Sequence, residues 1–247
     1  MAKLCTLYSG SSGNSTYLEN EGGAALLVDV GKTMKATREA LAEMDRSLEN
    51  IKGILLTHEH IDHIKGLKVL TKHYPMPIYG RGPTLAYLAQ HDLVAPSCQL
   101  IELTEGENTI ADFGIRYFDT PHDSVCCCGY QVTFSGGQTA AITTDLGYID
   151  DTVVDTIAGC DTILIESNYD EKMLDFGPYP YYLKRRIKGS GGHLSNAACS
   201  KVLPRLVEAG AKHIILGHLS EQNNLPALAL ETAACALKMS KIGRAHV

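Results

Sequence analysis

Three short apolar runs separated by turn-forming segments open the chain. The runs are Leu4–Tyr8, Thr16–Leu18 and Ala24–Val30, and the breaks at Ser9–Asn14 and Glu19–Gly23 are rich in Ser, Gly and Asn. Apolar runs of this length with such breaks are typical of strands joined by tight turns. The pattern therefore predicts three antiparallel strands at the start of the chain.

Strand-like and helix-like segments alternate through the rest of the chain. Apolar spacing and capping residues predict helices over Lys32–Met44, Pro83–His91, Ser195–Glu208 and Leu225–Met239. Compact apolar runs predict strands over Ile51–Thr57, Met76–Tyr79, Ile110–Asp119, Tyr130–Phe134, Thr139–Thr143, Thr162–Glu166 and His213–Leu216. Two strand-rich halves of this kind are consistent with two sheets flanked by helices, an α/β architecture.

Length and composition narrow the class of protein. With 247 residues, 45% of them hydrophobic and 20% charged, the chain can bury a full core, and we expect a single domain over residues 1–240. We find neither a long apolar stretch nor a signal peptide, so we expect a cytoplasmic protein that does not enter a membrane, with its eight cysteines reduced. The net charge of −6 would repel a polyanion on average, so any binding of nucleic acid must rest on a local basic patch.

Potential metal ligands cluster after one apolar strand. Four of them fall within six residues, at His58, His60, Asp62 and His63. They can converge if the chain turns at the end of the strand, and imidazole with carboxylate suits zinc, manganese or iron. Isolated His and Asp residues at strand ends are usually solvated, but this spacing favours a metal site.

Further candidates end other apolar strands. These are His122, Asp145 and His218 in the later part of the chain and Asp29 near its start. Strands that end at one edge of a sheet bring their last residues together, so these side chains could join the same site. A residue that caps a turn is the alternative for Asp29.

At this point the chain resembles the metallo-β-lactamase fold superfamily, whose five motifs match Asp29, His58-x-His60-x-Asp62-His63, His122, Asp145 and His218 in order. The resemblance covers essentially the whole chain and implies a four-layer αββα sandwich of two mixed β-sheets flanked by helices. It implies that His58, His60 and His122 bind a first metal. Asp62, His63 and His218 would bind a second, Asp145 would bridge both, and Asp29 would orient the ligand loop from behind.

Two bridged metals suit hydrolysis. They lower the pKa of a shared water from about 15.7 toward about 7 and polarise the oxygen that gains charge. A structural zinc site is normally closed by four ligands, often cysteines, whereas the seven ligands here would leave positions open. We expect two divalent metal ions, zinc in the first place with manganese as an alternative, and a hydroxide between them as nucleophile.

A basic segment gives the first indication of a substrate. Lys184, Arg185, Arg186 and Lys188 are flanked by tyrosines, and clustered cations beside aromatic rings can bind phosphates and stack on bases. A solvated helix face is the alternative. His193 follows just before a capped helix, where an imidazole can contact phosphate and protonate a leaving oxygen. A capping or packing role is the alternative for His193.

Within the superfamily, three segments resemble the bacterial exonucleases known as the YycJ or WalJ group. They are Glu166–Asp170, Gly192–Asn196 and Gly217–Asn224. The resemblance implies a phosphodiesterase acting on nucleic acid, DNA in the first place, with Asp62 and His193 as catalytic residues. The opening Ser9–Ser15 also matches the group, and its small residues could approach a phosphate through Asn14. A simple hairpin turn is the alternative there.

The chain departs from that group at Cys126–Cys128, where small polar residues and proline are usual. Three thiols beside the His122 motif could bind metal or sense redox state, but cysteine also packs as a small hydrophobe, and we favour packing. Two rival functions stay open. A small-molecule hydrolase of the glyoxalase II or lactonase kind would have a narrow pocket without a basic rim, and a metal-stabilised nucleic-acid binder would bind DNA without turnover.

The last seven residues, 241–247, resemble the translation of a sequencing adapter. We therefore expect a non-native tail there and a natural C-terminus that is missing, and we exclude His246 from the ligand candidates.

Overall fold

The computed structural model describes residues 2–240, so the suspected foreign tail lies outside the described residues. The strands are β1 (Lys3–Tyr8), β2 (Ser15–Glu19), β3 (Ala25–Val28), β4 (Ile51–Leu55), β5 (Ile78–Gly80), β6 (Leu100–Glu102), β7 (Asn108–Ile110), β8 (Phe113–Asp119), β9 (Cys128–Thr133), β10 (Thr139–Thr143), β11 (Thr162–Glu166) and β12 (His213–Gly217). The helices are α1 (Met34–Ala42), α2 (Ile61–Ile64), α3 (Leu67–His73), α4 (Gly82–Gln90), α5 (Asp151–Ile157), α6 (Glu171–Phe176), α7 (Tyr181–Lys188), α8 (Asn196–Glu208) and α9 (Pro226–Met239), with a 3₁₀ turn at Leu48–Asn50.

Two mixed sheets of six strands each hold these strands. The order in the first sheet is β1-β2-β3-β4-β5-β6, and in the second it is β12-β11-β10-β9-β8-β7. β1, β2 and β3 pair antiparallel, which confirms the three strands predicted at the start of the chain. β3, β4, β5 and β6 then pair in parallel, as do β10, β11 and β12.

One predicted strand was wrong in its extent. The run Ile110–Asp119 divides into the end of β7 and the whole of β8, which pair antiparallel as a hairpin. Ala111 and Asp112 form the turn, with φ angles of 47° and 65°. A left-handed turn reverses the chain within two residues, so a continuous apolar pattern concealed a hairpin.

Two compact units divide the chain, and they interleave in sequence. The first contains the residues up to Tyr117 together with Ser124–Cys128 and Val132–Gln138, and the second contains Phe118–Asp123, Gly129–Gln131 and the residues from Thr139 onward. β8 and β9 therefore each contribute residues to both units.

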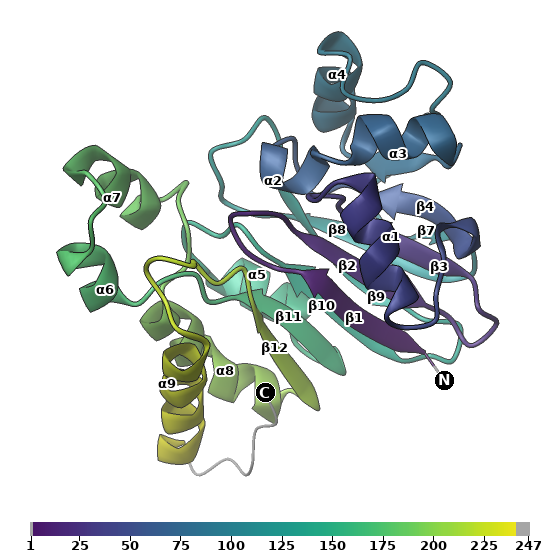
Figure 1. Cartoon of the computed structure of the whole chain (residues 1–247). Helices are drawn as coiled ribbons and strands as arrows, with labels where there is room; N and C mark the ends of the chain where they lie inside the picture. The colour runs from purple at the N-terminus through teal and green to yellow at the C-terminus, as the bar shows by residue number, and fades with distance from the viewer. Residues whose placement is uncertain (1, 241–247) are drawn as a thin grey trace. The chain divides into compact units, whose positions relative to one another are not determined.

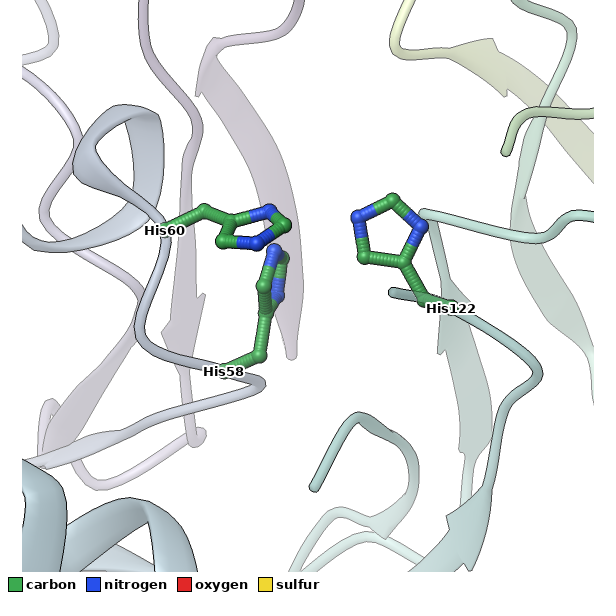
Figure 2. Close-up of side chains that lie close together, drawn as sticks. All are labelled: His58, His60 and His122. Atoms are coloured by element: carbon green, nitrogen blue, oxygen red, sulfur yellow. The ribbon is translucent and has the colours of Figure 1, made fainter. Parts of the chain in front are cut away.

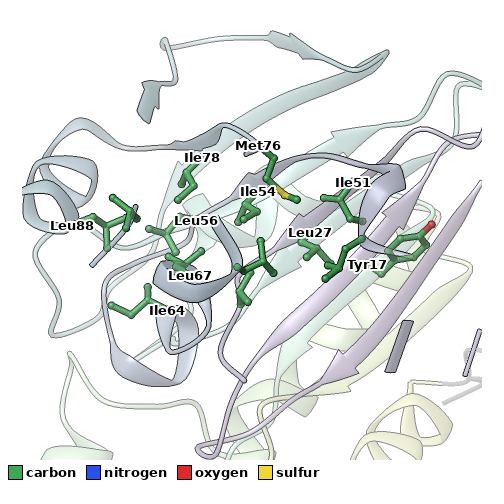
Figure 3. Packing of buried hydrophobic residues seen from close by; sticks show 14 of the residues in the cluster. Tyr17, Leu27, Ile51, Ile54, Leu56, Ile64, Leu67, Met76, Ile78 and Leu88 are labelled. Atoms are coloured by element: carbon green, nitrogen blue, oxygen red, sulfur yellow. The ribbon is translucent and has the colours of Figure 1, made fainter. Parts of the chain in front are cut away.

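Helices cover the first sheet through one apolar cluster in the first unit (Figure 3). Leu27 of β3 and Ile54 of β4 are fully buried, and Leu41 of α1, Leu67 of α3 and Leu88 of α4 pack into the same cluster. The apolar side of each helix thus faces the sheet, as expected of an amphipathic helix on a globular core.

The second unit has a matching cluster on the parallel strands β10, β11 and β12. Ile163 and Ile165 of β11 are buried beneath Leu203 of α8, Ile157 of α5 and Leu237 of α9 (elements in Figure 1). A strand buried on both faces reads as a continuous apolar run, which is why Thr162–Glu166 was predicted with its observed bounds. The carboxyl ends of these buried strands carry the candidate ligands.

Candidate metal centre

Three of the candidate ligands lie just after strands and have a strained backbone conformation themselves. Asp29 after β3, Asp145 after β10 and His218 after β12 have φ angles of 62°, 60° and 55°. This left-handed conformation is uncommon outside glycine, and such residues typically cost about 1–3 kcal/mol and cluster at functional sites. Asp45, Asp92, Ala111 and Asp112 share this conformation at turns, so the backbone angle supports the three ligand candidates only together with their side-chain contacts.

The ligand motif of the first unit forms a loop between β4 and α2. Figure 2 shows His58 and His60 on this loop, with their rings edge to face and their centroids 4.7 Å apart. Thr57 Oγ1 donates its one proton to Asp29 Oδ2 at 2.8 Å, so it accepts from His58 Nδ1 at 3.0 Å. That contact places the proton of His58 on Nδ1, so the lone pair of Nε2 is available for a metal.

Asp29 organises the same loop. Its carboxylate accepts from the backbone N–H of Thr57 at 2.9 Å and from Nδ1 of the fully buried His63 at 2.8 Å. The carboxylate thereby fixes both the start of the loop and the orientation of the His63 ring. This geometry is what the orienting role expected of Asp29 requires.

Asn14 lies beneath the loop rather than on its outer surface. It is 5% exposed, its Oδ1 accepts from Gly10 N at 2.8 Å, and its Nδ2 lies 3.0 Å from His63 Nε2 and 3.3 Å from Asp62 Oδ2. The amide is thus directed at two ligand candidates. Contact with a phosphate remains a prediction for Asn14.

A glycine makes this close approach possible. A Cβ on Gly31 would lie 1.7 Å from the carbonyl oxygen of Asp62 and 2.4 Å from Asn14 N. Any side chain at Gly31 would therefore push apart the loop and the segment that holds Asn14.

In the second unit, four side chains offer ligand atoms that all lie within 4.8 Å of one another: Asp145, Glu166, His193 and His218. Asp145 Oδ1 is 3.6 Å from His218 Nε2 and 3.7 Å from Nε2 of His122, whose loop also appears in Figure 2. Both carboxylates are buried, with 2% of Asp145 and none of Glu166 exposed. Buried carboxylates among imidazoles need a compensating positive charge, which protonated histidines or metal ions can supply.

Glu166 is the residue that sequence reasoning missed as part of the site. Its Oε1 lies 2.8 Å from His193 Nδ1 and 2.7 Å from His218 Nδ1, and its Oε2 accepts from the backbone N–H of Leu146 at 2.6 Å. Burial alone would raise the pKa of Glu166, but the two imidazoles outweigh it and hold the pKa below its ordinary value. The missed signal was an acid that ends β11, as Asp145 follows β10.

His122 is held by a backbone carbonyl. Its Nδ1 donates to Gly192 O at 3.0 Å, so Nε2 carries the lone pair. Burial lowers the pKa of His122, which favours the neutral ring that a metal requires. His122, His193 and His218 therefore all have Nδ1 engaged, by Gly192 or by Glu166, as is usual for histidines that bind metal through Nε2.

An amide network supports the second set of candidates. Asn168 Nδ2 donates to the carbonyl oxygen of His218 at 2.7 Å, and Asn224 Nδ2 donates to the carbonyl oxygen of Asn168 at 3.0 Å. Asn196 Nδ2 donates to Asn224 Oδ1 at 2.8 Å. The three sequence segments that resemble one nuclease group are therefore joined by buried hydrogen bonds around His193 and His218.

The residues present fit divalent metal ions. Both units supply buried imidazoles and carboxylates, and the Nδ1 contacts described above leave Nε2 of His58, His122 and His218 as the ligand atom. Nitrogen and oxygen donors of this kind suit zinc or manganese. The cysteines at 126–128 form no disulfide among the described residues, and Cys127 and Cys128 are buried, in keeping with packing.

The basic residues at 184–188 lie on α7, which buries none of its side chains. Arg186 pairs with Asp123, and Lys188 pairs with Asp175. His193 itself lines a cavity of about 240 Å³, together with Tyr148, Tyr169, Lys201 and others. Charged and aromatic side chains are therefore present both on α7 and in the cavity that His193 lines.

Comparison with known proteins identifies the family of this chain and two similar proteins. A family model described as "Beta-lactamase superfamily domain" matches residues 25–219. The chain is 34% identical over 240 residues to exodeoxyribonuclease YycJ of Bacillus anthracis, covering 96% of this chain and 89% of that protein. It is 36% identical over 247 residues to exodeoxyribonuclease WalJ of Streptococcus pneumoniae, covering 98% and 90%.

A solved structure shows the same fold. Zn²⁺-bound PqqB from Methylobacterium extorquens matches with a TM-score of 0.75 at 16% identity, covering 100% of this chain and 99% of PqqB. The two six-stranded mixed sheets flanked by helices are those expected from the sequence, so the predicted fold class is confirmed.

Proposed function

The chain belongs to the β-lactamase superfamily, and on this premise we propose that it is an exonuclease that hydrolyses DNA with two divalent metal ions. The broader class of this activity is that of a metal-dependent hydrolase that acts on phosphodiester bonds. It rests on one observation, near full-length similarity to two exodeoxyribonucleases, and the candidate ligand side chains of this chain fit divalent metal ions.

The ligand roles follow the order of the superfamily motifs. We assign His58, His60 and His122 to one metal, Asp62, His63 and His218 to the other, and Asp145 to both. Buried imidazoles and carboxylates in each unit support this assignment. Zinc is the first expectation and manganese the alternative.

Bound metal ions would supply an activated water and would neutralise charge on the phosphate. Residues around the candidate ligands orient the histidine rings. Asp29 and Thr57 orient His58 and His63, and Gly192 fixes the ring of His122. Removing a hydrogen-bond partner of a metal ligand typically lowers metal affinity or activity about 10- to 100-fold.

His193 would act on the leaving oxygen. Its Nδ1 lies 2.8 Å from Glu166 Oε1, and its side chain is 21% exposed, so Nε2 can donate a proton to substrate. The buried carboxylate of Glu166 fixes the orientation of the ring through this Nδ1 contact. Asp62 is the second catalytic candidate through its place in the ligand loop, where its Oδ2 lies 3.6 Å from His63 Nε2.

Lys184, Arg185, Arg186 and Lys188 would hold the nucleic-acid strand. In the described part of the chain no helix is long and apolar enough to cross a membrane. None of the eight cysteines forms a disulfide among residues 2–240, and we propose a cytoplasmic location, where reducing conditions disfavour disulfides.

End-labelled duplex DNA and RNA, incubated with purified protein and zinc or manganese, test the function. We expect mononucleotides or short products released progressively from one end of DNA, and no release with chelator present. Equal products from RNA would overturn the DNA preference. Turnover of a glutathione thioester without any cleavage of nucleic acid would instead identify a small-molecule hydrolase.

A further inference from the structure

Three aromatic rings on α6 and α7 are exposed to solvent. Phe176 is 90% exposed, Tyr181 is 76% exposed and Tyr182 is 74% exposed. Phe113 and Phe134, two of the other three phenylalanines of the chain, are buried in its core. Exposed rings concentrated in one short segment make this segment a candidate binding surface.

The same segment carries a charge opposite to that of the whole chain. In residues 170–189 five lysines and arginines stand against three acids, whereas the chain as a whole has a net charge of −6. A partner of this surface is therefore expected to be anionic and to present flat apolar faces.

Most of these cations already have partners within the protein. Lys184 Nζ donates to the carbonyl oxygens of Asp175 and Gly177, at 2.8 Å each, and Lys188 forms an ion pair with Asp175. These contacts hold α6 and α7 side by side (Figure 1). Arg185 makes no hydrogen bond or ion pair through its side chain with any residue between 2 and 240. Two of the cations, Arg186 and Lys188, are thus paired with acids, and the exposed rings offer contact surface that does not depend on charge.

A cavity lies between the two helices. Its volume is about 520 Å³, and Asp175, Tyr181, Lys184, Arg185 and Lys188 line it. This volume falls within the range of about 300–1,000 Å³ that is usual for small-molecule sites. The cavity can therefore take one nucleotide-sized group beside Arg185 and the ring of Tyr181.

We propose that α6 and α7 bind an unpaired nucleic-acid strand by stacking its bases on Phe176, Tyr181 and Tyr182, with Arg185 contacting phosphate. The proposal rests on the proposed function, since it requires a nucleic-acid substrate. Bases in a duplex are covered by their neighbours, whereas an unpaired strand exposes their faces to aromatic side chains. Because its rings can stack only on exposed base faces, this surface selects the unpaired strand over the duplex.

The absence of tryptophan from the chain allows a direct test. The Phe176→Trp variant places a single indole on the surface, and we expect a single-stranded phosphorothioate oligodeoxynucleotide to quench its fluorescence. The same backbone without bases should quench far less, and so should a blunt duplex of the same length. Equal quenching by the abasic strand would overturn the proposal, because phosphate contact alone would explain it.

A matched pair of variants separates stacking from charge. Phe176→Leu keeps apolar surface but removes the ring, and it should weaken binding of the base-bearing strand about 5- to 150-fold without changing the salt dependence. Arg185→Ala should reduce the slope of log affinity against log salt by about 0.7. Met239→Ala, at an exposed position on α9, should change neither. An unchanged affinity for Phe176→Leu would overturn the proposal.

The same fluorescence signal tests other occupants. Quenching by anionic phospholipid vesicles but not by the oligonucleotide would assign the rings to a membrane surface. A concentration-dependent change without any ligand would assign them to a second copy of the chain. Either result overturns the proposal. Turnover of end-labelled DNA by the parent protein, measured in the same preparation, shows separately whether the proposed function itself fails.

Discussion

Glu166 accepts hydrogen bonds at both oxygens, and this determines what a substitution there does. Gln at this position keeps the shape, but its amide N–H₂ must face either the imidazoles or the backbone N–H groups of Leu146 and Leu194. We expect Glu166→Gln to lower metal affinity or turnover about 10- to 100-fold. Metal titration and initial rates would measure this effect. The exposed Glu208→Gln is the control, and equal values for the two variants would contradict the role of Glu166.

His193 tests the proton donor itself. His193→Ala should leave metal content intact and lower turnover on DNA by about 10² to 10⁴, the usual contribution of a general acid. Elemental analysis and kcat together decide the role. Unchanged turnover would return His193 to packing, and loss of metal would make it a ligand.

Glu19 gives a residue-scale prediction away from the site. Hydrogen bonds from Arg46, and further ones from Tyr17 and Lys3, outweigh burial and lower the pKa of Glu19 from 4.5 to about 2. A depressed pKa stabilises the fold above the unfolded value, and this stability is lost as pH falls toward the folded value. Glu19→Gln should therefore be less stable than the parent at pH 7, by about 1–3 kcal/mol.

The difference between parent and Glu19→Gln should narrow steadily as pH falls from 4.5 toward 2, because only the parent loses this contribution. Urea unfolding at a series of pH values measures it. A difference that stays constant with pH would show that the carboxylate charge is not what stabilises this contact.

At the scale of elements, α8 begins where the site ends. Ser195 caps it by accepting from Ala198 N at 3.1 Å, two residues after His193. Ser195→Ala should cost about 0.5–2 kcal/mol of stability, whereas Ser195→Gly should cost only a few tenths. Urea midpoints of the two variants measure this. Equal losses would indicate that the contact of Ser195 Oγ with Glu171, absent from both variants, matters more than the cap.

The basic residues of α7 differ in their contacts within the structure. The four cations of the basic segment looked equivalent in the sequence, but Lys184 holds two carbonyl oxygens while Arg186 and Lys188 pair with acids. Exposed ion pairs of this kind contribute only about 0–1 kcal/mol. They can therefore rearrange toward phosphate at little cost, but Arg185 is available without rearrangement.

At the scale of the whole molecule, metal content is the main test. We expect about two metal ions per chain in protein prepared without chelator, as in a two-metal hydrolase. Asp145→Ala should lower both metal content and activity, since its carboxylate is assigned to both ions. Elemental analysis that consistently gives one ion or none would contradict the two-metal assignment.

The two compact units are proposed to form one domain. β8 and β9 each contribute residues to both units, so unfolding one unit would disrupt strands that the other contains. Covalent interleaving of this kind favours a single cooperative transition.

The sequence by itself determined most of the strands, the helices α1, α4, α8 and α9, and the positions of the ligand candidates, but neither β6 nor the division between β7 and β8. Apolar runs such as Thr139–Thr143 and Thr162–Glu166 matched the observed strands because buried parallel strands carry no polar interruption. The spacing of His58, His60, Asp62 and His63 identified a metal motif because such residues rarely follow a buried strand together. Strand composition and motif spacing each involve only neighbouring residues, so the sequence pattern is enough to identify them.

Only the tertiary structure decided which distant side chains meet. Glu166 contacts His193 and His218, 27 and 52 residues away, and no periodicity encodes that contact. Asn14 points toward His63 because Gly31 lets two loops approach closely. The hairpin within Ile110–Asp119 depended on a left-handed turn at two residues. Each of these depends on the path of the chain through space, since residues far apart in sequence become neighbours only when the fold is complete.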